Sequence, residues 1–388
     1  MSSLAIADRS GTPYLPSLDG LRALAVLMVV PHNLRLMVEP HDWATHVLDA
    51  ILDRGWIGVD LFFVLSGYLI TRILLNTRDT PHFFRNFYVR RILRIWPLYY
   101  LALLLMLALA PAMGWLPDRD RSYDPFFWLF LSNFVQPLHH RGPSLPHFWS
   151  LAVEEQFYLL WPLFVAWLRP RGLLGLCGGV MALSLGFRWW ALSRGWDPEV
   201  VYLRTWCRMD ALAMGSALAV WLQTPFAARW FQKRPRSAWV WPFGILFAGA
   251  AVSGGFRQFG LLPQSIGLLG LDLGMTALVA CVVAFDRGWV SGIVLLRHPV
   301  LQRIGRYSYG MYVWHVPLGV LVLMPWAHRM GWDVKPGAAL QTLYATGAVM
   351  ATYGVASLSY RWLESPFLAL KGRFAPTPDT ERISPATH

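Results

Sequence analysis

The stretch SLDGLRALAVLMVVPHN, residues 17–33, is an apolar run that contains one cationic and one titratable side chain. Arg22 lies near its start and His32 near its end. A charged side chain in the middle of a bilayer costs about 3 kcal/mol even on the mild insertion scales, so it normally faces protein or water. The stretch therefore predicts a membrane helix that turns a polar edge toward the protein interior.

The composition of the whole chain supports a membrane protein. Of its 388 residues, 55% are hydrophobic and only 14% are charged, and 21 are Trp. A soluble domain usually carries about 25% charged residues. Trp, Tyr and Phe are frequent near the ends of the apolar runs, as is typical of membrane interfaces.

The net charge of +12 does not indicate a nucleic-acid partner, because no basic tail or basic–aromatic module accompanies it. In a membrane protein, Lys and Arg gather in cytoplasmic loops and contact anionic headgroups. The three cysteines, Cys177, Cys207 and Cys281, are isolated and show no spacing typical of metal ligands. We interpret them as packing residues and predict no metal site.

Eleven apolar segments are candidate spans: 18–38, 56–75, 95–113, 125–137, 155–168, 172–192, 209–223, 239–255, 264–284, 305–326 and 338–357. FFWLFLSNFVQP, residues 126–137, is too short for a comfortable crossing. If it enters and returns, the basic linkers and both termini all fall on one side, as the positive-inside rule requires. We therefore predict an all-α bundle of about ten transmembrane helices, a short re-entrant segment near 125–137, and cytoplasmic termini.

The same pattern divides the chain into three parts. Residues 1–17 form a cytoplasmic N-terminal segment without the apolar region of a signal peptide, so the first span is expected to remain as an anchor. Residues 18–370 form a single transmembrane domain. Residues 371–388 contain Pro and Thr and are expected to form a disordered cytoplasmic tail.

Further polar side chains occur in or beside other predicted spans: Asp60, Ser66, His147, Trp149, Glu154, Glu155, Arg208, Asp210 and His315. Ionisable groups within membrane segments usually face a cavity or one another. Their number predicts a shared polar cavity. For Asp60 and Asp210 we favour structural pairing with arginine over catalysis, and for His315 packing is an equal alternative. Glu154 and Glu155 have the alternative of charges at a helix N-terminus, with Ser150 as a possible cap.

These residue types fit a transfer reaction. Histidine moves protons near neutral pH, and arginine binds the phosphates of a donor such as an acyl-CoA thioester. Transfer from a thioester to an alcohol needs a base for the hydroxyl group or a nucleophile that carries the acyl group.

Six stretches occur in an order that resembles the acyltransferase family 3: SLDGLRALAVLMVVPHN, GWIGVDLFFVLSGYLITRILL, FYVRRILRIWPLYYL, FWSLAVEEQFYLLWP, RMDALAMGSALA and SYGMYVWHVPL. WLESPF, residues 362–367, resembles the closing motif of the family. The members are integral-membrane O-acyltransferases that modify extracytoplasmic glycans and some small molecules. The resemblance implies about ten spans with both termini inside, a bacterial inner membrane, and no bound cofactor. It also implies acyl-CoA, most often acetyl-CoA, as donor, and a glycan, lipid-linked sugar or small-molecule hydroxyl as acceptor.

The resemblance also assigns roles to residues. Arg22 and His32 correspond to the basic residue and histidine of the first span, with His32 as base or transient acyl carrier. Arg90, Arg91 and Arg94 correspond to the arginine motif, and we expect them to bind the donor phosphates. Glu154 and Glu155 are expected to orient the acceptor or assist His32 at the outer mouth.

One spacing departs from the family. Members usually place ten residues between the basic residue and the histidine, whereas this chain places nine, so Asn33 occupies the in-register position. Pro31 can kink the helix and rotate His32 back toward the cavity.

The main alternative is a transporter, because polar residues at membrane depth also fit a substrate or proton pathway. Its usual sign is internal symmetry between two halves, and the sequence shows none. A non-catalytic scaffold or receptor is the third possibility.

Overall fold

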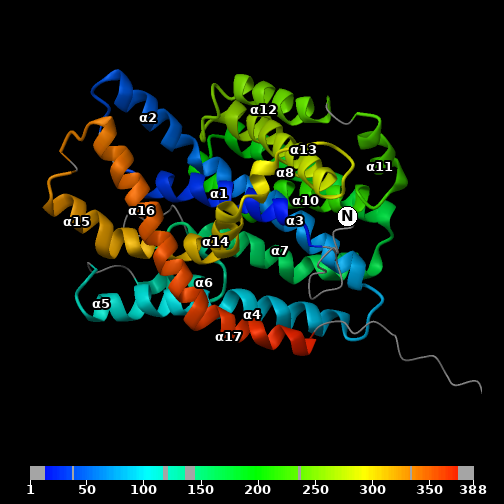
Figure 1. The fold of residues 1–388 in the computed structure, drawn as a ribbon, viewed down its shortest axis with the longest axis horizontal. Helices are drawn as coiled ribbons and strands as arrows, with labels where there is room; N and C mark the ends of the chain where they lie inside the picture. Colours follow the sequence, from blue (N-terminus) through cyan, green and yellow to red (C-terminus); the bar gives the residue numbers. More distant parts are fainter. Residues whose placement is uncertain are drawn as a thin grey trace, which may run out of the picture.

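The computed structural model describes residues 14–36, 39–116, 121–135, 145–234, 237–332 and 334–374. Within these ranges the regular elements are all helical and no strand occurs (Figure 1), which confirms the predicted all-α class. Most of the predicted N-terminal segment 1–17 and, after Phe374, the predicted tail 371–388 lie outside the described residues.

The α-helices follow one another as α1 (Pro16–Leu34), α2 (Trp43–Asp53), α3 (Ile57–Thr77), α4 (Phe83–Leu103), α5 (Ala110–Ala112), α6 (Asp124–Trp128), α7 (Phe148–Trp167), α8 (Pro170–Ser193), α9 (Pro198–Leu203), α10 (Thr205–Trp221), α11 (Pro225–Gln232), α12 (Val240–Val252), α13 (Leu268–Asp286), α14 (Pro299–Leu318), α15 (Met324–Arg329), α16 (Ala338–Ser359) and α17 (Ser365–Leu370). Short π-helical segments join α4 to α5, α14 to α15 and α16 to α17. Each apolar segment expected from the sequence overlaps one of these helices.

Five continuous helical runs are long and apolar enough to cross a membrane: Trp43–Thr77, Phe83–Ala112, Pro170–Ser193, Pro263–Asp286 and Pro299–Arg329. A sixth is obtained if α10 and α11, which are bent by 90°, count as one span. These helices support an integral membrane protein. The count of about ten spans is not confirmed and stays a prediction.

Helix α1 is not among those runs because Asp19, Arg22 and His32 lower its average hydropathy. It lies in the middle of the bundle, where it contacts α3, α13, α14 and α16 (Figure 1). Most of its apolar side chains are buried by these neighbours, whereas Leu24 is exposed. A position among helices rather than lipid explains why α1 tolerates polar residues.

The predicted re-entrant segment forms two short helical turns in its described part, α6 and the 3₁₀ turn Ser132–Phe134, and no helix of spanning length. The hydroxyls of Tyr99 and Tyr100 donate to the carbonyls of Phe127 and Trp128, at 2.7 and 3.1 Å. These bonds tie the turns to α4. Residues 136 and 137 lie outside the described residues.

Glycines fix the register of α1 against two neighbours. A Cβ placed on Gly58 of α3 would lie 2.5 Å from the carbonyl oxygen of Ala25, and one on Gly305 of α14 only 1.9 Å from that of Asp19. Only glycine permits such close backbone approach. The start of α1 is therefore level with Gly305 of α14.

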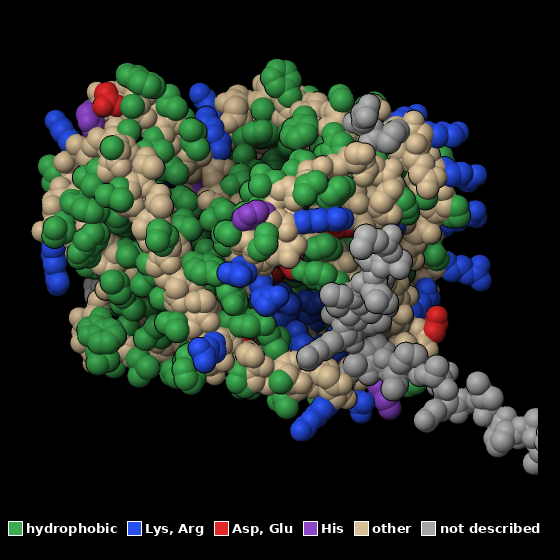
Figure 2. Space-filling view, in the orientation of Figure 1, with side chains coloured by type: hydrophobic (Ala, Val, Ile, Leu, Met, Phe, Trp, Pro, Cys, Tyr) green, Lys and Arg blue, Asp and Glu red, His purple; other side chains and the backbone are tan. Residues whose placement is uncertain are grey.

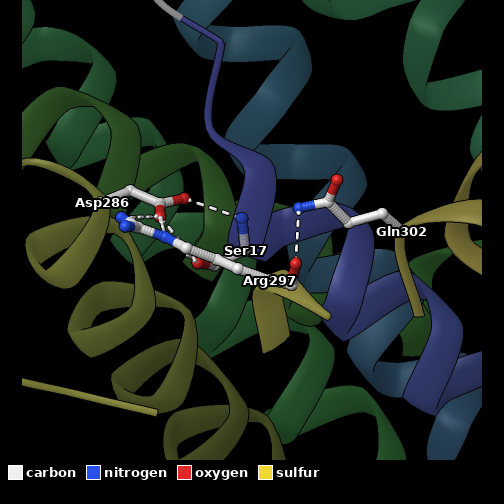
Figure 3. Close-up of polar contacts among 4 residues, drawn as sticks. All are labelled: Ser17, Asp286, Arg297 and Gln302. Atoms are coloured by element: carbon white, nitrogen blue, oxygen red, sulfur yellow. Dashed lines mark hydrogen bonds and ion pairs between the residues drawn. The ribbon is translucent and has the colours of Figure 1, made fainter. Parts of the chain in front are cut away.

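The first turn of α1 is held by a carboxylate from another helix (Figure 3). The Ser17 backbone N–H donates to Asp286 Oδ2 at 2.9 Å, and the Ser17 hydroxyl donates to Oδ1 at 2.6 Å. Arg297 donates to the same Oδ1 through Nη2 at 2.7 Å. Asp286 thus caps α1 and joins the end of α13 to the segment that precedes α14.

Replacing Asp286 by Ala is expected to lower the free energy of unfolding by about 1–3 kcal/mol, because Ser17 and Arg297 both lose a buried acceptor. Thermal unfolding followed by circular dichroism measures the change. Asp79→Ala, at an exposed position, is the control and should leave the melting temperature unchanged. Equal melting temperatures for the two variants would contradict the capping role.

Candidate active site

Three adjoining cavities lie among α1, α3, α4, α7, α14 and the C-terminal helices. The first, which we call the chamber, has a volume of about 100 Å³ and is lined by residues of α1, α3, α4, α7 and α14. The second, the mouth, measures about 280 Å³ and continues past Tyr14, Asp19 and Glu364. The third, the side pocket, measures about 170 Å³ and lies beside the start of α4. Figure 2 shows Lys and Arg side chains gathered in a hollow of the face in view.

The chamber combines carboxylates and arginines. Ser66 of α3 donates a hydrogen bond of 2.8 Å to Glu154 Oε1 of α7. Glu155 and Tyr158 also line the chamber, Tyr158 one helical turn beyond Glu154 on the same face of α7. Arg22 faces both the chamber and the mouth. The structure thus brings together Arg22, Ser66, Glu154 and Glu155, all predicted site residues.

The position of the two glutamates within α7 excludes one of the two predicted alternatives, a charge at the helix terminus. We expected them at an outer mouth beside His32, or as charges at a helix terminus. Helix α7 instead begins at Phe148, after His147, and its first turn holds no acidic residue. Ser150 does not cap the helix: its hydroxyl donates to the His147 carbonyl at 3.2 Å. Glu154 and Glu155 consequently lie in the second turn, beside Arg22.

The predicted phosphate-binding arginines line the same cavities. Arg91 and Arg94 border all three, and Arg90 borders the side pocket. The Arg91 guanidinium lies over the ring of Tyr158, 5.5 Å from its centroid, which fixes its orientation. These positions form a basic route from the mouth to the chamber.

His32 is not among the residues that line these cavities. It lies ten residues beyond Arg22 on α1, about 15 Å along the helix axis. Its Nδ1 is 3.0 Å from the Leu52 carbonyl oxygen and 3.0 Å from Arg35 Nη1. Only one of these bonds can form at a time. Nδ1 must carry a proton to donate to the Leu52 carbonyl, and it must have a free lone pair to accept from the Arg35 guanidinium. With Nδ1–H bonded to Leu52, Nε2 is the basic nitrogen.

Asn33 bonds within its own helix, donating to the Val29 carbonyl at 3.1 Å. Pro31 lies inside α1, which continues to Leu34. The predicted role of His32 as base or acyl carrier stays a prediction.

Asp60 and Asp210 form the structural ion pairs that we favoured. Asp60 of α3 pairs with Arg208 of α10, and Asp210 pairs with Arg188 of α8 at 2.6 Å. All four side chains are 0% exposed, as is Asp272 of α13 nearby. None of them lines the three cavities, so the network holds helices together.

The two buried histidines lie next to the chamber but do not line it. The rings of His147 and His315 are 4.6 Å apart, and each packs against Tyr312. Tyr312 lines the chamber, and its hydroxyl is 2.5 Å from that of Ser150, which also lines it. Trp149 packs edge-on against Phe63, another chamber residue, with ring centroids 5.9 Å apart.

Sequence reasoning missed several residues of these cavities: Arg72, Tyr158, Arg306, Tyr309 and Glu364. The i, i+4 spacing of Glu154 and Tyr158 was a readable signal. Glu364 lies in the WLESPF stretch, which we had treated only as a closing motif. Arg72 and Arg306 follow no pattern that separates them from other basic residues near span ends.

Residues 15–361 match the model of a family described as an acyltransferase domain, acyltransferase family 3. The chain belongs to this family. It is 33% identical to a putative peptidoglycan O-acetyltransferase of Bacillus subtilis, over 91% of this chain and 55% of the relative. It is 31% identical to the peptidoglycan O-acetyltransferase OatA of Listeria monocytogenes, over 92% of this chain and 56% of that protein.

A putative O-acetyltransferase of Staphylococcus aureus is 28% identical, over 91% of this chain and 57% of the relative. The chain thus spans somewhat more than half the length of these curated relatives. No solved structure matches it.

Proposed function

We propose that this chain is an O-acyltransferase that moves an acyl group, most often acetyl, from acyl-CoA to a hydroxyl group of a peptidoglycan-like glycan. The observation that carries the proposal is the chamber, where a serine–carboxylate pair meets a row of arginines that leads outward. Family membership supports the reaction class, and the names of the relatives support the acceptor.

The basic mouth and side pocket suit the donor. A CoA thioester carries several phosphate charges on one end and an uncharged acyl arm on the other. Arg90, Arg91 and Arg94 offer planar guanidinium groups to the phosphates. The arm would then extend into the chamber, with its thioester beside Ser66 and Glu154.

The carboxylates suit the proton transfers. An attacking hydroxyl must lose a proton, and the departing thiolate must gain one. Glu154 already accepts a hydrogen bond from a hydroxyl at 2.8 Å, which is the geometry required of a general base. Arg22 and Arg91, which line the same chamber, provide positive charge for a developing oxyanion.

The membrane arrangement of the proposal follows the sequence analysis. With about ten spans and cytoplasmic termini in a bacterial inner membrane, the mouth near the start of α1 opens toward the cytoplasm, where acyl-CoA is made. His32 then lies toward the opposite side, from which an envelope glycan would approach.

The test uses the full chain in liposomes with [14C]acetyl-CoA and soluble peptidoglycan fragments. We expect release of the CoA thiol together with the gain of acetyl groups on the glycan, measured by a thiol reagent and by mass spectrometry. Uptake of either compound into the vesicles without thiol release would favour a transporter and overturn the proposal.

Replacing Arg91 or Arg94 by Gln is expected to raise the KM for acyl-CoA about 10-fold to 100-fold, because a charge-assisted hydrogen bond to phosphate is lost. Initial-rate kinetics with varied acyl-CoA measure this. Arg229→Gln, an exposed arginine of α11, is the matched control. An unchanged KM in both chamber variants would place the donor elsewhere.

Replacing His32 by Ala tests whether His32, rather than Glu154, takes the proton of the acceptor hydroxyl: in that case kcat for transfer to the glycan falls about 100-fold. The KM for acyl-CoA should stay the same, because His32 does not line the donor cavities. His46→Ala, on the exposed side of α2, is the control. Full transfer by folded His32→Ala protein would remove His32 from the mechanism.

A further inference from the structure

The hydroxyl of Ser66 lies where the chamber meets the mouth. Ser66 lines both cavities, so a thioester that reaches the chamber through the mouth passes it. Its Oγ donates to Glu154 Oε1 at 2.8 Å. A hydroxyl bonded to a carboxylate is the arrangement in which a base activates a nucleophile.

Tyr158, which lines the same two cavities, also hydrogen-bonds Glu154 and Ser66. Three other chamber hydroxyls are bonded differently. The Tyr309 hydroxyl donates to the Ile95 carbonyl at 2.7 Å. The hydroxyls of Tyr312 and Ser150 lie 2.5 Å apart, so that one donates to the other, and the second donates to the His147 carbonyl. A main-chain carbonyl cannot take a proton from its donor. Ser150 is bonded to Tyr312 and His147 and lines the chamber but not the mouth.

The backbone beneath Ser66 is held rigidly. A Cβ on the next residue, Gly67, would lie 2.0 Å from the Leu212 carbonyl oxygen, so α3 and α10 are in direct backbone contact there. On the other side of the contact, a Cβ on Gly215 would lie 2.1 Å from the Val64 carbonyl oxygen. A reactive group on a fixed element keeps its geometry toward the substrate.

We propose that Ser66 is the nucleophile that carries the acyl group, with Glu154 as its base. Ser66 Oγ attacks the thioester carbonyl carbon while Glu154 takes the hydroxyl proton. The tetrahedral oxyanion that forms faces Arg22 and Arg91. As it collapses, the C–S bond breaks, Glu154 returns the proton to sulfur, and free CoA leaves behind an ester on Ser66.

The second half-reaction restores the enzyme. An acceptor hydroxyl attacks the acyl-Ser66 carbonyl carbon, and Glu154 takes its proton. The bond between the acyl carbon and Ser66 Oγ breaks, and the proton passes to Oγ. The sum is acyl-CoA plus alcohol giving ester plus CoA. This inference rests on the proposed function and answers a point left open by the sequence, namely which residue carries the acyl group.

The experiment traps the intermediate. The full chain in liposomes is mixed with [14C]acetyl-CoA without glycan, quenched, and digested for mass spectrometry. We expect one acetyl group per active protein, on the peptide that contains Ser66, and its loss when peptidoglycan fragments are added. The label should resist neutral hydroxylamine and be released by alkali, as for an ester.

Two variants identify the carrier. Ser66→Ala should lose the label and at least 100-fold of the transfer rate. Ser66→Cys should regain a label, now as a thioester that neutral hydroxylamine releases. Ser216→Ala is the matched control, because Ser216 sits on the α10 face against α3, donates to the Leu212 carbonyl at 2.8 Å and lines none of the three cavities. Size-exclusion chromatography and thermal unfolding verify that each variant is folded.

The possible results distinguish a failure of the serine-carrier inference from a failure of the proposed acyltransferase function. Transfer to glycan with full rate by folded Ser66→Ala, or a label on His32 instead, would overturn the serine carrier while leaving the acyltransferase intact. Transfer without any trapped label in the native protein, with quenching shown to be fast enough by a burst measurement, would also overturn it. Absence of acetyl-CoA consumption by the native protein would overturn the proposed function itself.

Discussion

Replacing Glu154 by Gln is expected to lower kcat for acyl transfer by about 10²-fold to 10⁴-fold while leaving the fold unchanged. Gln is nearly isosteric with Glu, and its Oε1 can still accept the Ser66 hydrogen bond of 2.8 Å. It cannot take a proton, so the contribution of a positioned general base is removed. The KM for acyl-CoA should change little, because the arginines that border the mouth remain. Steady-state kinetics in liposomes, with thiol release and glycan acetylation followed in parallel, measure both constants.

Glu199→Gln supplies the control, since Glu199 is exposed on α9 and lines none of the three cavities. It should retain native kinetics. Glu155→Gln tests how far the effect is specific to the serine-bonded carboxylate, because Glu155 lines the same chamber but Ser66 bonds to Glu154. A fully active Glu154→Gln protein, or an equal loss in Glu199→Gln, would contradict the role of Glu154 as base.

The helices were predictable from the sequence because apolar length is a local property. The predicted runs 18–38, 56–75 and 264–284 overlap α1, α3 and α13, the last together with the helical turn Pro263–Gly267 that precedes it. Which helices face lipid is not local. Helix α1 is surrounded by α3, α13, α14 and α16, and only the packed structure reveals this. The same limit applies to the number of spans.

Part of the site was also predictable. Arg22, Arg91, Arg94, Glu154 and Glu155 were named from the sequence, and they do line one chamber. Their position within α7 was not, because it depends on where α7 begins. That helix starts at Phe148, so the glutamates lie about one turn further from its first residue than a cap at Ser150 would have placed them.

Partner choice was the least predictable feature. The sequence indicated that Asp60 would pair with an arginine, but it did not indicate which one. Arg208 lies almost 150 residues away on α10, and the pair depends on which face of α10 is turned toward α3. Arg188 was overlooked because it stands beside two tryptophans at the end of an apolar run, where an interfacial arginine is ordinary. The contact of His32 with Leu52 likewise depends on α2, which no motif described.

The buried ion pairs give the largest expected change in stability. Replacing Arg208 by Met should lower the free energy of unfolding by about 3–5 kcal/mol, the usual result of breaking a buried pair. Arg208 and Asp60 are 0% exposed, and the buried Asp272 interacts with both. Without Arg208, Arg188 is the one arginine among the described residues of this network that remains to balance the buried carboxylates Asp60, Asp210 and Asp272. Arg208 also packs over the rings of Tyr202 and Phe63, which the Met side chain partly replaces.

A second substitution tests whether unpaired charge is the cause. Adding Asp60→Asn to Arg208→Met removes one surplus carboxylate, so the double variant should recover at least half of the lost stability, and the two effects should be strongly non-additive. Arg35→Met is the matched control: its pair with Asp53 is 2.9 Å long but Asp53 is 50% exposed, so the loss should stay within about 1 kcal/mol. Thermal unfolding of the variants in one detergent provides the comparison. A melting temperature of the double variant below that of Arg208→Met would contradict this explanation. Lost side-chain packing, and not an unpaired charge, would then account for the lower stability.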